Sequence, residues 1–144
     1  MRFKLCFCIV GVLLSISGCS KTPTPGSSPA AEQAAIDAAQ KWLSLVDGGQ
    51  YSESWEQGAE YFRSAIPKAK WEQTIKAVRV PLGAQISRVV TSKQYTTSVP
   101  GAPDGQYVVI QFTTSFKNKK SATETVTPML DKDGSWRVSG YYIK

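Results

Sequence analysis

The sequence predicts an α+β fold in which about three N-terminal helices pack on a curved, four-stranded antiparallel sheet. Three observations predict it. Apolar residues recur with the 3.6-residue period of a helix up to about residue 80, and with a period of two after residue 82. Short sequences rich in Gly, Pro, Asn and Asp separate the strand-like runs, as is typical of neighbouring antiparallel strands. Helices first and strands second is the order of an α+β domain.

The first predicted helix begins after Ser28, an N-cap residue, with Pro29 at its first helical position. Gly48 and Gly49 predict its end. Its apolar residues share one face: Ala31, Ala35, Ala38, Ala39, Trp42, Leu45 and Val46.

Two further helical stretches are predicted before the strands. One covers about 52–65, and Gly58 indicates a break inside it. The other opens at Pro67 and carries Trp71, Ile75 and Val78 in one stripe. Pro81 is expected to end that helix, because a proline removes a helical hydrogen bond.

Four strands are expected over 84–91, 107–116, 123–130 and 136–143. The alternation assigns one face of each strand to the core. The core-facing residues include Ile86, Arg88, Val90, Val108, Ile110, Phe112, Glu124, Val126, Leu130, Trp136, Val138 and Tyr142. The same alternation places Tyr107, Val109 and Gln111 on the opposite face. Turns are expected over 100–105, 117–120 and 131–134.

The N-terminus carries the sequence of a bacterial lipoprotein signal peptide. Two basic residues precede the apolar run 5–16, and small residues lead to Cys19. As a helix, that run would rise about 18 Å, short of the roughly 30 Å of a bilayer core. An ordinary secretory signal is the competing interpretation, since Gly18 also suits its peptidase. The cysteine favours cleavage before Cys19 and lipid attachment to it.

The predicted organisation is a signal peptide over 1–18, a lipidated Cys19 with a Pro/Ser-rich tether over 19–30, and one domain over 31–144. Acyl chains on Cys19 would anchor the protein to a membrane. In Gram-negative bacteria, serine at position 20 is typical of outer-membrane lipoproteins that face the periplasm. We therefore expect an envelope protein, and no nucleic-acid partner, although the chain has a net charge of +6.

Composition excludes several kinds of site. The chain has no histidine, and its three cysteines are Cys6, Cys8 and Cys19, so the processed domain would keep no free thiol. Zinc sites of the usual kinds and nucleophiles activated by histidine are therefore excluded. No metal, cofactor or catalytic residue is expected.

Two charged residues fall on the core-facing side of the predicted strands. Glu124 is in phase with Val126, and Arg88 is in phase with Val90. One interpretation makes them polar groups of a cleft whose walls are Trp55, Trp136 and Tyr142. The other places them near strand ends, where they reach solvent or pair with each other. Glu53, Glu56 and Glu60 are expected to form a solvated helix face.

The order of helices and strands resembles the nuclear-transport-factor-two-like cone, a curved-sheet architecture comparable to that of cystatin. The whole domain is more similar still to an uncharacterised bacterial family, domain of unknown function 4019. The segments that carry this resemblance are Lys41-Trp42-Leu43, Val46-Asp47, Ser54-Trp55, Phe62-Arg63, Ala77-Val78-Arg79, Pro81-Leu82-Gly83 and the ranges 100–105, 126–130 and 133–142. The cone resemblance implies a cleft that in some members binds small ligands or runs proton transfer. The family resemblance implies no activity.

Three functions are compatible with the sequence. The first is an anchored module that binds an envelope protein, polymer or membrane component. The second is a protein that holds a small apolar ligand in the cleft between helices and sheet. The third is a histidine-free, isomerase-type enzyme that uses a buried carboxylate and a phenol. The first is favoured, and the sequence leaves the partner, ligand and oligomeric state open.

Overall fold

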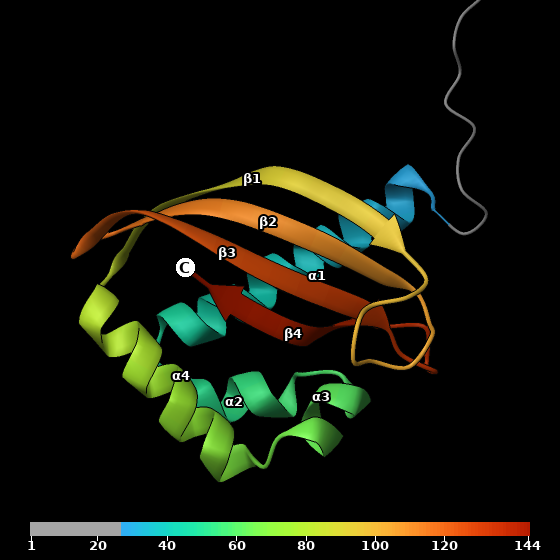
Figure 1. Ribbon diagram of the computed structural model, residues 1–144, viewed down its shortest axis with the longest axis horizontal. Helices are drawn as coiled ribbons and strands as arrows, with labels where there is room; N and C mark the ends of the chain where they lie inside the picture. The colour runs from blue at the N-terminus through green and yellow to red at the C-terminus, as the bar shows by residue number, and fades with distance from the viewer. Residues whose placement is uncertain (1–26) are drawn as a thin grey trace, which may run out of the picture.

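Figure 1 shows the computed structural model, which describes residues 27–144. Its four helices are α1 Pro29–Asp47, α2 Tyr51–Glu56, α3 Glu60–Ala65 and α4 Lys68–Leu82. Its four strands are β1 Gln85–Thr96, β2 Tyr107–Phe116, β3 Lys119–Leu130 and β4 Trp136–Ile143. They form one antiparallel sheet in the order β1-β2-β3-β4. The α+β prediction is confirmed. The predictions for residues 1–26, including Cys19, lie outside the described residues.

The helix boundaries follow the signals in the sequence. At the start of α1, the Ser28 hydroxyl accepts a hydrogen bond of 3.0 Å from the Ala31 N–H. The predicted break at Gly58 divides 52–65 into α2 and α3. A Cβ added to Gly58 would lie 2.5 Å from the Phe62 ring, so the close approach of the two segments needs a glycine here.

The end of α4 differs slightly from the prediction. Pro81 lies inside the last turn, and the helix ends one residue later, before Gly83 with a φ of 74°. The loop between β2 and β3 caps this end, because Asn118 donates from its side chain to the Pro81 carbonyl and from its backbone to the Leu82 carbonyl, both at 3.0 Å. That loop is shorter than expected, since β3 already begins at Lys119.

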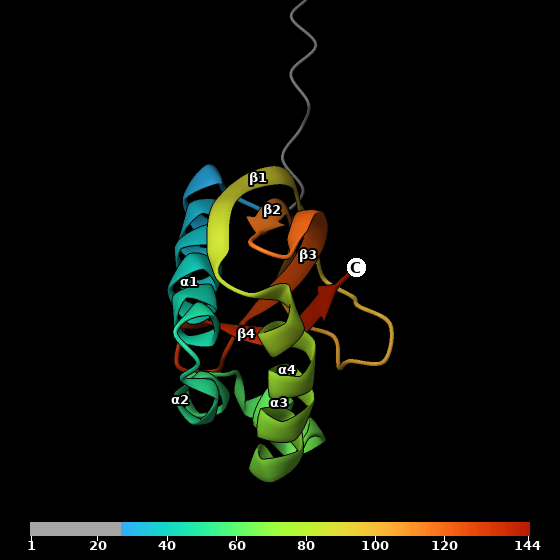
Figure 2. The same cartoon turned by 90° about the vertical axis from the view of Figure 1, so that its left-hand side faces the viewer.

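The helices cover one face of the sheet and the side of β4. Figure 2 shows α1 running along the sheet, with α2, α3 and α4 gathered near β4. α1 contacts all four strands, whereas α4 packs mainly on α2. The shared core combines α1, α4, β2 and β3 side chains, among them Leu43, Ile75, Ile110, Phe112 and Val126. No helix within 27–144 is both long and apolar enough to cross a membrane.

The predicted alternation holds in β2 after Tyr107 and through most of β3, and it fails in β1. Most inward residues of β2 and β3 are buried, including Val108, Phe112 and Glu124, whereas Leu130 is half-buried. In β1 an extra residue interrupts pairing near Ile86, which is 66% exposed instead of core-facing. Val90 does lie opposite Phe112 but stays 38% exposed at this edge of the sheet.

An extra residue in β4 exchanges the faces of its two tyrosines. Thr127 pairs with Gly140 and Pro128 pairs with Val138, so Ser139 has no partner position on β3. The side chains after this bulge shift to the other face. Tyr141 therefore packs against the core, and Tyr142, predicted to face inward, is 60% exposed.

The outward assignment of Tyr107 is also wrong. Its side chain is fully buried, and its hydroxyl donates a hydrogen bond to the Pro103 carbonyl in the loop before β2. The turn at 100–105 thus folds back over the beginning of β2. Gln111, on the same predicted face, is exposed as expected.

Candidate functional site

Glu124 lies at the centre of a buried network of charged side chains. It is fully buried in β3 and accepts five hydrogen bonds. Arg88 Nε and Thr114 Oγ1 donate to its Oε2 at 2.6 and 2.7 Å. Tyr141 Oη, Arg79 Nη1 and Arg88 Nη2 donate to its Oε1 at 2.8, 3.1 and 3.2 Å. Both carboxylate oxygens therefore have their lone pairs directed at protein donors.

Asp47 is the second acceptor of the network. Its Oδ2 accepts from Arg88 Nη1 at 2.7 Å, and its Oδ1 accepts from Arg79 Nη2 at 2.5 Å and from Arg88 Nη2 at 3.0 Å. Two arginines thus face two carboxylates, and the four formal charges cancel. We call Asp47, Arg79, Arg88, Glu124 and Tyr141 the ion network.

The network is built from distant parts of the chain. Asp47 ends α1, Arg79 lies in the last turn of α4, and Arg88, Glu124 and Tyr141 come from β1, β3 and β4. The bulge at Ser139 is what turns Tyr141 inward. The Arg79 guanidinium also lies 4.6 Å from the centre of the Phe116 ring, a cation–π contact. Each of these five elements therefore contributes one side chain to the ion network.

The electrostatics favour the charged forms of Asp47, Arg79 and Arg88 and the neutral form of Tyr141. Burial acts to raise the pKa of Asp47, but the hydrogen bonds and charges of Arg88 and Arg79 outweigh burial and lower it. Burial likewise opposes the charge on Arg88, yet Asp47 and Glu124 raise the pKa of that guanidinium. Burial and then the charge of Glu124 raise the pKa of the Tyr141 hydroxyl, which stays protonated and donating.

This arrangement is suited to holding elements together and poorly suited to proton transfer. A general base needs a lone pair within reach of substrate, and all five contacts of Glu124 are to protein groups. Asp47 and Arg88 expose 20% and 12% of their side chains. Among the described residues, Arg79 Nε is a buried side-chain nitrogen without a hydrogen-bond partner. No group of three acidic side chains within 27–144 is placed to hold a metal ion.

The remaining residues proposed for the cleft are not brought to this network. Trp55 donates its indole N–H to the Ile66 carbonyl at 2.8 Å and packs on the edge of the core. Trp136 lines a separate small hollow between α1 and β4. Tyr142 lines a groove on the other side of β4. Of the five residues, the structure joins Arg88 and Glu124 in direct contact.

Aromatic side chains fill the space between helices and sheet. Trp42 lies 5.7 Å from Trp71 and 5.4 Å from Tyr141, measured between ring centres. Phe62 meets Trp71 edge-on at 4.9 Å. The indole nitrogens are also satisfied, since Trp42 donates to the Ser54 carbonyl and Trp71 to the Ser54 hydroxyl. The interior is a packed core at this point.

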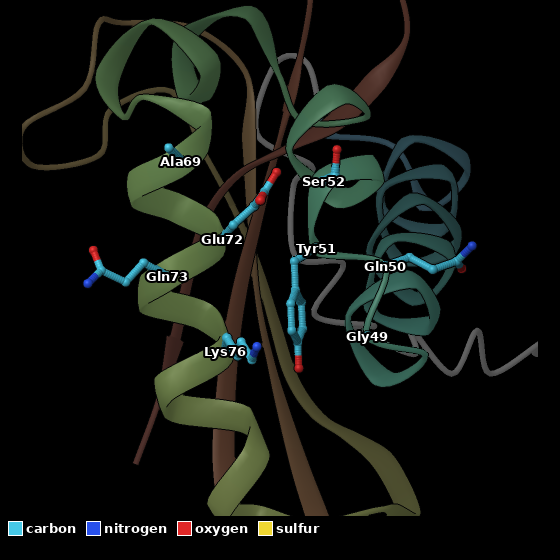
Figure 3. Close-up of a pocket in the computed structure, with 8 residues that line it drawn as sticks. All are labelled: Gly49, Gln50, Tyr51, Ser52, Ala69, Glu72, Gln73 and Lys76. Atoms are coloured by element: carbon cyan, nitrogen blue, oxygen red, sulfur yellow. The ribbon is translucent and has the colours of Figure 1, made fainter.

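The hollows of the described surface lie outside this core. One of about 500 Å³ lies between the start of α2 and α4. Figure 3 shows Tyr51, Glu72 and Lys76 directed into it and Gln73 directed away. A second hollow of about 220 Å³ is apolar and separates α4 from β4. Its lining residues are Trp71, Thr74, Ile75, Val78, Tyr141, Tyr142 and Ile143.

Comparison with known families places the chain in one of them. The model of the family described as "Protein of unknown function (DUF4019)" matches residues 38–141. The chain belongs to this family. No curated protein and no solved structure matches the chain. The DUF4019 match runs from within α1 into β4 and includes every residue of the ion network.

Sequence reasoning about this DUF4019 domain found Arg88 and Glu124 and missed the other three members of the network, Asp47, Arg79 and Tyr141. Arg79 lies two turns after Trp71, the core stripe of α4, and that spacing is the signal that was available. Asp47 follows the last buried residue of α1, and this position alone does not indicate that its carboxylate pairs with two arginines. Tyr141 could not be found, because the bulge that turns it inward has no signature in the alternation of β4.

Proposed function

We propose that this protein is a lipid-anchored binding module of the bacterial envelope, without catalytic activity. The processed chain is held through acyl groups on Cys19, and its domain faces the periplasm from the outer membrane. Its partner is an envelope component that contacts the outside of the domain.

The observation that carries this proposal is the filled space between helices and sheet. A protein that encloses a small apolar ligand needs a cavity, typically of about 300–1,000 Å³, lined by apolar side chains. Here Trp42, Phe62 and Trp71 pack against one another in that space. The carboxylate and phenol that an isomerase would use are engaged with protein groups instead, since the Tyr141 hydroxyl donates to Glu124 and accepts from Arg79. Binding on the surface is therefore favoured over both alternatives.

The outer face of the sheet supports the same proposal. The register places Gln111 beside Thr125, and Thr113 beside Thr123, and Thr125 in turn beside Tyr142. These side chains alternate with the buried residues of β2 and β3 and therefore point away from the helices. They form an uncharged, hydroxyl-rich surface on a chain of net positive charge. Such a surface can dock without desolvating charged groups.

Two experiments in the native bacterium test the proposal. Lipid anchoring predicts that the mature protein carries acyl chains and that Cys19→Ala leaves unprocessed or soluble protein. Unchanged membrane fractionation and acyl labelling of that variant would contradict the anchor.

The binding role is tested with a photo-crosslinking amino acid placed at Gln111, on the outer face of the sheet. Gln40, an exposed residue on α1, is the matched control position. We expect a reproducible adduct from position 111 and a different or weaker pattern from position 40. Absence of any reproducible adduct from either position would refute a stable surface partner.

A further inference from the structure

The groove between α4 and β4 combines two features, an exposed apolar surface and an open strand edge. Trp71, Ile75 and Val78 of α4 are spaced by four and three residues and so face the groove side by side. Val78 is 38% exposed and Tyr142, on the opposite wall, is 60% exposed. The groove therefore presents apolar surface to water along one side of a strand.

The second feature is an open strand edge. Lys144 and Thr123 exchange two backbone hydrogen bonds of 2.8 and 3.0 Å, so the backbone of Lys144 points toward β3. Because these directions alternate along an antiparallel strand, the N–H and C=O groups of Tyr141 and Ile143 point the other way, toward α4. Within the described chain, no backbone hydrogen bond reaches β4 from that side at these two residues.

The same edge already accepts a chain segment at its other end. The Ala59 N–H, in the connection before α3, donates a 2.8 Å hydrogen bond to the Val138 carbonyl. With the bulge at Ser139 between them, Val138 and Tyr141 direct their backbone groups to the same side of β4. The first half of this edge is thus covered by α3, and the second half is open beside the groove.

The charges around the groove are positive. Its lining contains no acidic residue. Lys70 lies one helical turn from Thr74 in the lining, and Lys144 directly follows β4. The β2–β3 hairpin, which caps α4, adds exposed Lys117, Lys119 and Lys120 near the same end. A partner with acidic side chains would complement this surface.

We propose that an extended acidic peptide segment of a partner protein adds to the open half of β4 as a fifth strand. Its backbone would pair with Tyr141 and Ile143, and alternate apolar side chains would enter the groove against Val78. Added strands lie about 4.8 Å from their neighbour, between β4 and α4. This inference rests on the proposed binding role and names the surface and the class of partner.

The observations favour a peptide over other occupants. A volume of about 220 Å³ is below the usual range for a site that encloses a small molecule, but it suits individual apolar side chains. A lipid headgroup would satisfy the lysines and leave the backbone groups of the strand edge unused. Of a peptide, a small molecule and a lipid headgroup, a peptide is the occupant whose backbone can pair with the open edge of β4.

The test uses the full-length protein in detergent and a displayed library of short random peptides. We expect selection of sequences that combine acidic residues with alternating apolar ones. For a selected synthetic peptide, Val78→Asp should weaken binding at least about tenfold, because it places a charge in the apolar groove. Val80→Asp is the matched control, since Val80 lies on the same helix, is 61% exposed and is absent from the groove lining. It should leave the dissociation constant within about twofold.

A second measurement tests strand addition itself. N-methylation of single peptide positions should abolish binding at every second residue and be tolerated between them, because alternate N–H groups face β4. Amide hydrogens of Tyr141 and Ile143 should also exchange more slowly in the complex.

Three outcomes would overturn the inference: no enrichment over the unselected library, equal binding to the Val78→Asp and Val80→Asp variants, or N-methylation that acts without alternation. If position 111 still yields a crosslinked partner in cells after such an outcome, the groove assignment fails and the binding role stands.

Discussion

Replacing Glu124 by glutamine tests whether the ion network stabilises the domain. Both oxygens of Glu124 accept hydrogen bonds from cationic or hydroxyl donors, so either orientation of the amide sets its NH₂ group against donors. The substitution also leaves two buried guanidinium groups facing Asp47 alone. Breaking a buried ion pair from one side costs about 3–5 kcal/mol. At about 4 °C per kcal/mol for a domain of this size, the Tm should fall by about 12–20 °C.

Urea unfolding followed by tryptophan fluorescence measures the loss in the free energy of unfolding, and a thermal scan with the same signal measures the fall in Tm. Both changes are visible because Trp42 and Trp71 are buried in the core. The control is Glu32→Gln, which removes the partner of Lys93 in a half-exposed salt bridge of 3.0 Å. That pair should contribute less than about 1 kcal/mol. A Glu124→Gln variant within about 1 kcal/mol of the wild type would show that the buried charges are dispensable, and the reasoning from burial would fail.

Two further predictions concern the ends of α1 and α4. The pKa of Asp47 is lowered in the folded protein, so its contribution to stability is complete above its ordinary value of 3.8 and is lost as the pH falls through the lowered pKa. Asp47→Asn should therefore be less stable than the wild type at neutral pH, and the difference in urea midpoint should shrink on acidification below about pH 4; a constant difference would contradict this. Gly83→Ala should destabilise more than Gly101→Ala in the same assay. Both glycines have φ values near 75–80°, where a Cβ costs about 1–2 kcal/mol, but the Cβ at 83 would also approach Asn118 and Lys117 at 3.1 and 3.2 Å. Equal effects would show that the contact with the hairpin is immaterial.

The elements of this fold were largely predictable from local signals. Ser28 and Gly58 mark helix boundaries through backbone chemistry that depends on a few neighbouring residues, and Pro81 predicted the end of α4 to within one residue. The alternation of β2 and β3 was equally clear, because both strands lie inside the sheet with one face buried. Periodicity predicts an element well when one face of that element meets the core throughout its length.

The errors concentrate in the edge strands, where bulges change the phase. An extra residue leaves the composition of a strand unchanged but reverses the face of every later side chain. Ser139 does this in β4, so Tyr142 was assigned to the interior, although Tyr141 is the tyrosine that packs there. Edge strands tolerate such insertions because a residue on an open edge has no second neighbour to keep in register. The residues that this error affects are therefore the ones after a bulge, such as Tyr141, whose orientation decides which polar groups come into contact.

The bulge at Ser139 links the interior to the proposed binding edge. It turns the hydroxyl of Tyr141 toward Glu124, which closes the ion network from the β4 side. The same shift directs the backbone groups of Tyr141 and Ile143 toward α4, away from β3. Without the extra residue, Tyr142 would take the inward position, and the open backbone groups would belong to Gly140 and Tyr142. One inserted residue thus sets both the burial of the network and the register in which a fifth strand could pair.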